Sequence, residues 1–185
     1  MLAAALTVAV ISCSAEADPQ TAPTSLSTPT SAPTSTPTAE ATDDPNAPVE
    51  PVLPAGAEAD SRAGAEAFVR YYIELLNYAG LTGDVAELRQ QAADCLSCDS
   101  LVDTFRQTYA DGGRYETNGW QIESQFTVRD AEADWASLLE VRQSETTWIA
   151  EAGAEPKRYE PKQLHMRFLI KRLDRGWAIV RFTQT

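Results

Sequence analysis

Residues 119–128, GWQIESQFTV, decide the fold, because here the apolar pattern changes from helical spacing to the alternation of a strand. Four apolar side chains fall on even positions and are predicted to share one face: Trp120, Ile122, Phe126 and Val128. Similar alternation recurs over residues 135–141, 164–170 and 177–182. In the last run, Ala178, Val180 and Phe182 are predicted opposite Trp177 and Ile179. Residues 174–176 predict a tight hairpin turn between the last two runs. The second half of the chain therefore predicts an antiparallel sheet of about four strands.

The residues before this sheet predict three helices. Between Ser61 and Gly80 apolar side chains recur at helical spacing, and Gly80 is expected to end the first helix. A second helix is expected after Asp84, which with Glu87 resembles a capping box. The third should cover about residues 100–110.

Runs of helices followed by runs of strands predict an α+β fold with the helices packed on one face of the sheet. Residues 60–185 have a common size for one domain with one hydrophobic core. This region contains no internal repeat and no apolar stretch long enough to cross a membrane. We therefore expect a single α+β domain over residues 60–185.

The segment before this domain has the composition of a disordered tether, predicted over residues 13–59. Nine of the 11 prolines lie between Pro19 and Pro54, interleaved with Thr and Ser, and they block both helix and ladder pairing. Residues 14–60 also hold eight acidic and no basic side chains, which leaves 19 acidic against 15 basic side chains in the rest. The net charge of −12 therefore belongs largely to the tether, and neither part has the basic footprint of a nucleic-acid binder.

Residues 10–13, VISC, end an apolar run and predict a lipoprotein signal. The run is too short to span a bilayer, and the small Ser12 before Cys13 suits a lipoprotein signal peptidase. We expect residues 1–12 to be removed as a signal peptide and fatty acyl groups such as palmitate to be attached at Cys13. More than one acyl chain gives stable anchoring, so the expected location is the extracytoplasmic face of the cell membrane, with membrane lipid as a partner.

The interpretation of the motif Cys95-Leu96-Ser97-Cys98 depends on whether the domain lies in an oxidising or a reducing compartment. In an exported domain it predicts a disulfide between Cys95 and Cys98. Zinc would need further ligands, and the chain offers only His165 as a nitrogen donor. A thioredoxin-like redox role would place the motif between a strand and a helix, whereas here it joins two predicted helices. Zinc binding and redox chemistry are the alternatives to a structural disulfide, and we assign no metal or cofactor.

The sequence assigns no catalytic residue. His165, the single histidine, is predicted on the outer face of its strand with Gln163 and Arg167, whereas a base in a helix-covered cavity would project from the other face. Six carboxylates are better explained as helix caps or solvated charges than as an acid/base pair. They are Asp84, Asp94, Asp99, Asp103, Asp130 and Asp134. The sequence has no phosphate-binding loop, nucleophile elbow or metalloprotease helix.

Four motifs, taken in order, resemble an uncharacterised family of actinobacterial lipoproteins with a domain of unknown function. They are Leu76-Asn77-Tyr78-Ala79, Thr82-Gly83-Asp84, Cys95-x-x-Cys98 and Tyr109-x-x-Gly112-Gly113. The resemblance implies a fold similar to the nuclear-transport-factor-2-like cone, in which a curved antiparallel sheet wraps around helices and leaves a pocket. It implies no activity, since that fold hosts enzymes and binders alike.

The sequence leads to two hypotheses of function. The favoured one is a membrane-anchored extracytoplasmic lipoprotein whose non-catalytic domain binds a small ligand or another envelope protein. The alternative is a cone-fold enzyme acting on a small hydrophobic molecule, which requires a cavity holding a carboxylate and a partner within hydrogen-bond reach. The sequence does not locate the ligand pocket. The two hypotheses therefore have to be distinguished by the residues that line the pocket in the structure.

Overall fold

The structure is a computed structural model that describes residues 47–184. The predicted signal peptide over residues 1–12, Cys13 and most of the predicted tether lie outside the described residues. The helices are η1 (Ala55–Glu58), α1 (Arg62–Thr82), α2 (Ala86–Gln90) and α3 (Leu96–Ala110). The strands are β1 (Gly112–Thr117), β2 (Trp120–Arg129), β3 (Trp135–Gln143), β4 (Thr146–Glu151), β5 (Lys157–Tyr159), β6 (Lys162–Leu173) and β7 (Gly176–Gln184).

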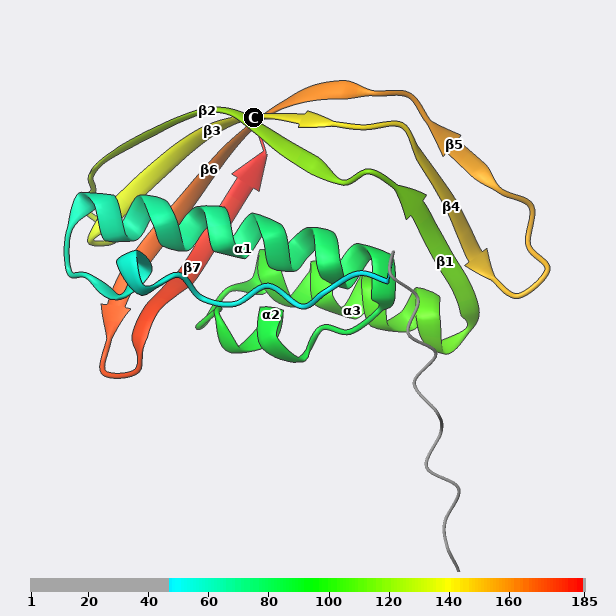
Figure 1. Cartoon of the computed structure of the whole chain (residues 1–185), viewed down its shortest axis with the longest axis horizontal. Helices are drawn as coiled ribbons and strands as arrows, with labels where there is room; N and C mark the ends of the chain where they lie inside the picture. The colour runs from blue at the N-terminus through cyan, green and yellow to red at the C-terminus, as the bar shows by residue number, and fades with distance from the viewer. Residues whose placement is uncertain (1–46, 185) are drawn as a thin grey trace, which may run out of the picture. The chain divides into compact units, whose positions relative to one another are not determined.

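The strands form two antiparallel sheets, which confirms the α+β class and corrects the prediction of a single sheet (Figure 1). The larger sheet has the order β2-β3-β6-β7 and consists of the four alternating runs that the sequence predicts. The smaller sheet has the order β1-β4-β5 and was not predicted. β5 lies within the polar stretch after β4, and its three residues are all exposed, so no apolar alternation marks it.

The two sheets meet at a bend, through which three stretches of chain pass directly from one sheet into the other. Each stretch consists of two successive strands joined by two residues, and the three joints lie side by side across the sheets. β1 continues into β2 through Asn118-Gly119, β3 continues into β4 through Ser144-Glu145, and β5 continues into β6 through Glu160-Pro161. On the larger sheet, the residues next to the bend form one cross-strand row, namely Trp120, Gln143 and Lys162. On the smaller sheet the matching row is Thr117, Thr146 and Tyr159. Cross-strand partners share a face, so each row presents its side chains together.

Hydrogen bonds from α1 and from neighbouring strands hold this bend. The Asn77 side chain of α1 accepts a hydrogen bond from Trp120 N through Oδ1 at 2.7 Å and donates one from Nδ2 to Trp120 O at 3.0 Å. Ser144 N donates to Gly119 O at 3.1 Å, and Asn118 N donates to Ser144 Oγ at 3.1 Å. The first helix is therefore tied to the point where the chain passes from one sheet to the other.

The three helices lie against one side of the strands (Figure 1), and α1 supplies the centre of the core. Ser61 caps α1 by accepting a hydrogen bond from Gly64 N at 3.0 Å. The helix continues past Gly80 to Thr82 and ends at Gly83, whose left-handed φ of 77° suits a glycine C-cap. The predicted end at Gly80 is therefore wrong. The buried face of α1 carries Phe68, Val69, Tyr72, Leu75, Leu76 and Ala79.

The ordered domain also begins before the predicted boundary at residue 60. η1 precedes that boundary, and its Ala57 is buried in the core. Trp177 of β7 donates a hydrogen bond from Nε1 to Ala59 O at 3.2 Å, which fastens this segment to the sheet.

The other two helices differ from prediction at their N-termini. Asp84 accepts a hydrogen bond from Ala86 N at 3.0 Å, but Glu87 does not complete a capping box, because its carboxylate accepts from the Tyr71 hydroxyl and the Gln91 amide instead. α3 begins at Leu96, about one turn before the predicted residue 100.

Two β-bulges place Phe126 and Phe182 on the opposite face of their strands from the one that alternation predicts. A register shift between Ile122 and Ser124 turns Phe126 outward, where it is 62% exposed. A second irregularity, between Leu169 and Ile170, turns Phe182 of β7 inward, where its ring stacks on Phe168 at 5.7 Å between centroids. Strict alternation was therefore a wrong guide to the faces of β2 and β7.

The bend predicts a position-specific cost for a glycine substitution. Gly119 and Gly153 both have a left-handed φ, 76° and 81°, so Gly→Ala introduces similar backbone strain at each. A Cβ on Gly119 would lie 2.5 Å from Asn77 Oδ1, whereas one on Gly153 meets nothing within 4 Å. We expect Gly119→Ala to lower the free energy of unfolding by about 2 kcal/mol more than Gly153→Ala, the net value of the two Asn77 bonds.

Urea denaturation of the two variants measures this difference. Equal losses of unfolding free energy in both would contradict the role of Asn77 in holding the bend.

Candidate functional site

A pocket of about 170 Å³ lies under the bend, between the strands and helices α1 and α3. α1 contributes Leu76, Asn77 and Gly80 to it, and α3 contributes Leu101 and Phe105. The strands and the bend contribute Tyr115, Thr117, Gly119, Trp120, Gln143 and Thr146. The pocket therefore combines residues far apart in the sequence, and the Asn77–Trp120 hydrogen bonds form part of its wall.

The polar groups of this pocket are amides and hydroxyls, and several already have partners. Both functional atoms of Asn77 are engaged by the Trp120 backbone. The Thr117 hydroxyl lies 2.9 Å from Thr146 Oγ1 and 3.0 Å from Ser144 Oγ. Gln143 makes no side-chain hydrogen bond within residues 47–184. Its amide is therefore available to a ligand in the pocket.

A second, open groove of about 320 Å³ adjoins the pocket. The two share three residues, Tyr115, Gln143 and Thr146. The groove adds Trp148, Tyr159, Lys162 and Thr104 to its lining. Tyr115 stacks on Trp148 with 6.4 Å between ring centroids and meets Phe105 edge-on at 5.5 Å.

The groove is rich in aromatic surface and holds one cation. Trp148 donates a hydrogen bond from Nε1 to Thr108 Oγ1 at 3.2 Å, which fixes the ring. Burial raises the pKa of the Tyr115 phenol, so this hydroxyl keeps its proton at neutral pH. Lys162 is exposed, and within the described part of the chain it forms no ion pair with a carboxylate. The pocket and groove together offer an apolar chamber beside an aromatic, positively charged mouth.

Comparison with known protein families gives one match. The model of a family of unknown function, DUF6318, matches residues 35–183. The chain belongs to this family. No curated protein matches the chain.

Three solved structures similar to this DUF6318 member have sequence identities of 8–18%. One is the intermembrane space region of the chloroplast protein ARC6, with 14% identity and a TM-score of 0.48, covering 68% of this chain and 97% of that one. Another is an NTF2-like protein of unknown function in nutrient uptake from Rhodospirillum rubrum, with 18% identity and a TM-score of 0.42, covering 63% and 96%. A third is Aln2 from a Streptomyces species, with 8% identity and a TM-score of 0.43, covering 65% and 89%.

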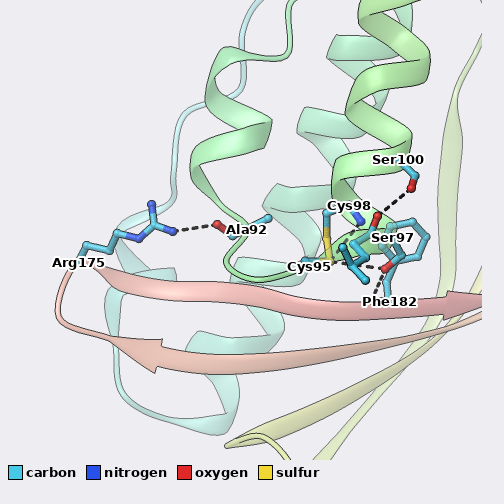
Figure 2. The surroundings of a disulfide bond; sticks show 8 residues. Ala92, Cys95, Ser97, Cys98, Ser100, Arg175 and Phe182 are labelled. Atoms are coloured by element: carbon cyan, nitrogen blue, oxygen red, sulfur yellow. Dashed lines mark hydrogen bonds between the residues drawn. A yellow bond between two sulfur atoms is a disulfide. The ribbon is translucent and has the colours of Figure 1, made fainter.

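The cysteine motif of this DUF6318 member lies outside the pocket lining. Figure 2 shows its surroundings at the start of α3, beside β7. The Sγ atoms of Cys95 and Cys98 are 2.02 Å apart, a disulfide distance, and both residues are buried. Cys95 Sγ also accepts a hydrogen bond from Cys98 N at the start of α3. Ser97 Oγ accepts a hydrogen bond from Phe182 N at 3.2 Å, and Arg175 donates to Ala92 O at 2.9 Å.

The segment that carries this motif covers part of the outer edge of β7. Ala93 N donates to Ile179 O at 2.9 Å, and Ile179 N donates to Gln91 O at 2.9 Å. Together with the Ser97 contact, these bonds pair backbone groups of an edge strand that would otherwise face solvent. The geometry is that of a structural clasp between the helices and the sheet.

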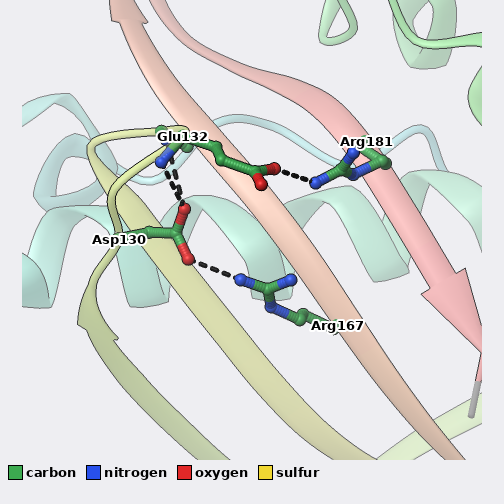
Figure 3. Close-up of polar contacts among 5 residues, drawn as sticks. Asp130, Glu132, Arg167 and Arg181 are labelled. Carbon is green, nitrogen blue, oxygen red and sulfur yellow. Dashed lines mark hydrogen bonds and ion pairs between the residues drawn. The ribbon is translucent and has the colours of Figure 1, made fainter.

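The titratable residues considered from the sequence lie away from the pocket. His165 is exposed on β6 opposite Glu140, on the face that points away from the helices. On the same outer face, Asp130 pairs with Arg167 and Glu132 pairs with Arg181 (Figure 3). The backbone N–H of Glu132 and the Arg167 guanidinium lower the pKa of the Asp130 carboxyl.

The remaining carboxylates have local structural partners or lie on the surface. Asp103 pairs with Arg106, and Asp134 accepts a hydrogen bond from Arg172 N at 2.6 Å. Asp94 stands out by its positive φ of 49° in the turn before Cys95. Asp99 lies in the first turn of α3 rather than at its cap. The structure therefore brings no two of the six aspartates together in the pocket.

No group of three or more His, Cys, Asp or Glu side chains within residues 47–184 is placed to hold a metal ion. Within the same range, no helix combines the length and apolar character needed to cross a bilayer.

The lining of the pocket predicts opposite effects for two glycine substitutions in α1. A Cβ on Gly80 would meet only the Phe105 ring, at 3.8 Å, an ordinary contact, whereas a Cβ on Gly64 would lie 2.0 Å from Ala59 O. We expect Gly80→Ala to raise the free energy of unfolding by about 0.5–1 kcal/mol through helix propensity. Gly64→Ala should lower it. Thermal and urea denaturation of both variants measure these changes. Destabilisation by Gly80→Ala would contradict the presence of room for a Cβ between Gly80 and the Phe105 ring.

Proposed function

We propose that this protein is a membrane-anchored extracytoplasmic lipoprotein whose domain binds a small apolar ligand in the pocket under the bend, without catalysis. One observation carries the assignment of the site: the pocket is lined by apolar side chains, amides and hydroxyls, and by no carboxylate, histidine or cysteine. A concave apolar site with a few polar groups is the usual form of a small-molecule site.

The composition of the lining favours binding over acid/base chemistry. The Asn77 amide is engaged by backbone, and the Thr117 and Thr146 hydroxyls bond to each other at 2.9 Å. General acid/base catalysis needs a group that exchanges a proton near the working pH. Tyr115 is the titratable group of the lining, and burial moves its pKa upward, further from neutrality.

The enzyme hypothesis required a cavity with a carboxylate and a partner in hydrogen-bond reach. Asp130 instead pairs with Arg167 on the outer face of the larger sheet. Glu87 accepts hydrogen bonds from Tyr71 and Gln91 outside the pocket lining. This arrangement supports the binding function as the better explanation of the fold.

The location is proposed from the sequence. A lipid at Cys13 would anchor the chain, and the tether would give the domain reach from the membrane. An oxidising extracytoplasmic environment would keep Cys95 and Cys98 joined, and their sulfur separation of 2.02 Å is compatible with such a bond. The clasp over β7 would then be covalently closed.

Binding is tested with the neutral fluorophore phenylnaphthylamine and the full chain carrying Cys13→Ala. We expect the dye to bind with enhanced fluorescence. Leu101→Trp, which adds volume to a side chain of the lining, should weaken binding about tenfold, as should the stable variant Gly80→Ala. The matched control is Leu96→Trp, the same change in α3 at a side chain that is 84% exposed and outside the lining.

Fluorescence titration and urea denaturation of each variant separate loss of binding from loss of folding. Equal affinities for all four proteins would place the dye elsewhere and overturn the proposed site.

Anchoring is tested by cell fractionation. The chain with Cys13 intact should be found with membranes, and Cys13→Ala should move it to the soluble fraction or block its processing, because the acylated thiol is lost. Ser14→Ala, next to the lipidated position, serves as the control and should leave membrane partition unchanged. Membrane retention of Cys13→Ala at the same processed size as the chain with Cys13 intact would refute the lipoprotein proposal.

A further inference from the structure

We propose that the ligand of this pocket is an amphipathic anion, with its apolar body in the chamber and its anionic head in the adjoining groove at Lys162. The inference rests on the proposed binding function and adds the chemical class of the ligand. It follows from the way the chamber and the groove share a wall.

The shared wall is continuous across the bend. Gln143 is the cross-strand partner of Trp120 on one side and of Lys162 on the other, so the three side chains form one row on the face of the sheet that looks toward the helices. Trp120 lines the chamber and Lys162 lines the groove, while Gln143 lines both. A molecule that extends from the chamber along this row therefore reaches the ammonium group after passing the amide.

The mouth of the groove carries a positive charge, as a binding site for an anion requires. Its lining holds one basic residue, Lys162, and no acidic residue. A second cation lies nearby, since Lys157 Nζ is 5.1 Å from the centroid of the Tyr159 ring. The Gln143 amide, which bonds to no other side chain in the described region, adds a neutral donor between chamber and mouth.

Between the chamber and Lys162 the groove walls are aromatic, so they also suit the part of a flat or chain-like body that extends out of the chamber. Tyr115 and Trp148 present a stacked pair of rings, and Tyr159 stands in the cross-strand row beside Thr146. The chamber of about 170 Å³ and the adjoining groove of about 320 Å³ together have room for a body of two linked ring systems or a short chain, but not for the two acyl chains of a bilayer phospholipid. The proposed occupant is therefore a free amphiphile whose anionic head meets Lys162.

A matched pair of dyes tests this class. Anilinonaphthalene sulfonate and phenylnaphthylamine share the same ring system and differ by the sulfonate. In the full chain carrying Cys13→Ala, Lys162→Gln should weaken binding of the sulfonate dye about fivefold, as expected for one exposed charge, and leave the neutral dye unchanged. Raising the salt concentration should weaken only the sulfonate dye, because screening acts on the charged head.

The control variant is Lys171→Gln, which removes an exposed lysine from the opposite face of the same strand and outside both linings. It should change the affinity of neither dye. If Lys162→Gln affects both dyes equally, or neither, the anionic class is overturned while the apolar pocket stands. If the neutral dye does not bind the Cys13→Ala chain that carries no substitution in the pocket or groove, the proposed function itself fails.

Discussion

The shared bend of the three long strands is the constraint on which the rest of the domain depends. A flat sheet would leave α1 and α3 covering only one of the two groups of strands. Because β1, β4 and β5 turn at the same level, the smaller sheet reaches the helices from another direction, and Phe105 of α3 meets Tyr115 of β1. The Asn77 side chain holds the bend from inside through both polar groups of the Trp120 backbone. Two such partly buried bonds contribute about 2 kcal/mol together.

The same bend creates the candidate site. Residues on either side of it line the chamber, and the row from Trp120 through Gln143 to Lys162 carries the lining outward to the groove. The clasp at Cys95 and Cys98 lies elsewhere, against β7, where it covers the sheet edge. Structural and candidate binding roles are thus placed in different parts of one domain, and the only cysteine pair of the described residues belongs to the structural part.

The predictability of the fold differed between its elements for physical reasons. Long periodic segments such as α1 and β6 were predicted because burial of one face imposes a period on their residues. β5 was missed because three exposed residues carry no such period. Phe126 and Phe182 were assigned to the wrong faces because a bulge adds one residue to a strand without a distinct mark in its sequence. The pocket was not located, since its lining comes from two helices and four strands that only folding brings together.

The sequence by itself determined the α+β class, the four strands of the larger sheet, the three helices and the cysteine pair, because periodicity and spacing are local properties of the chain. It also provides the whole case for a lipid at Cys13 and for the tether. Tertiary structure alone decided the second sheet, the faces of β2 and β7, and the meeting of Lys162 with the aromatic groove. These features depend on where strands bend and bulge, and the bend depends on contacts such as Asn77 with Trp120, 43 residues apart in the chain.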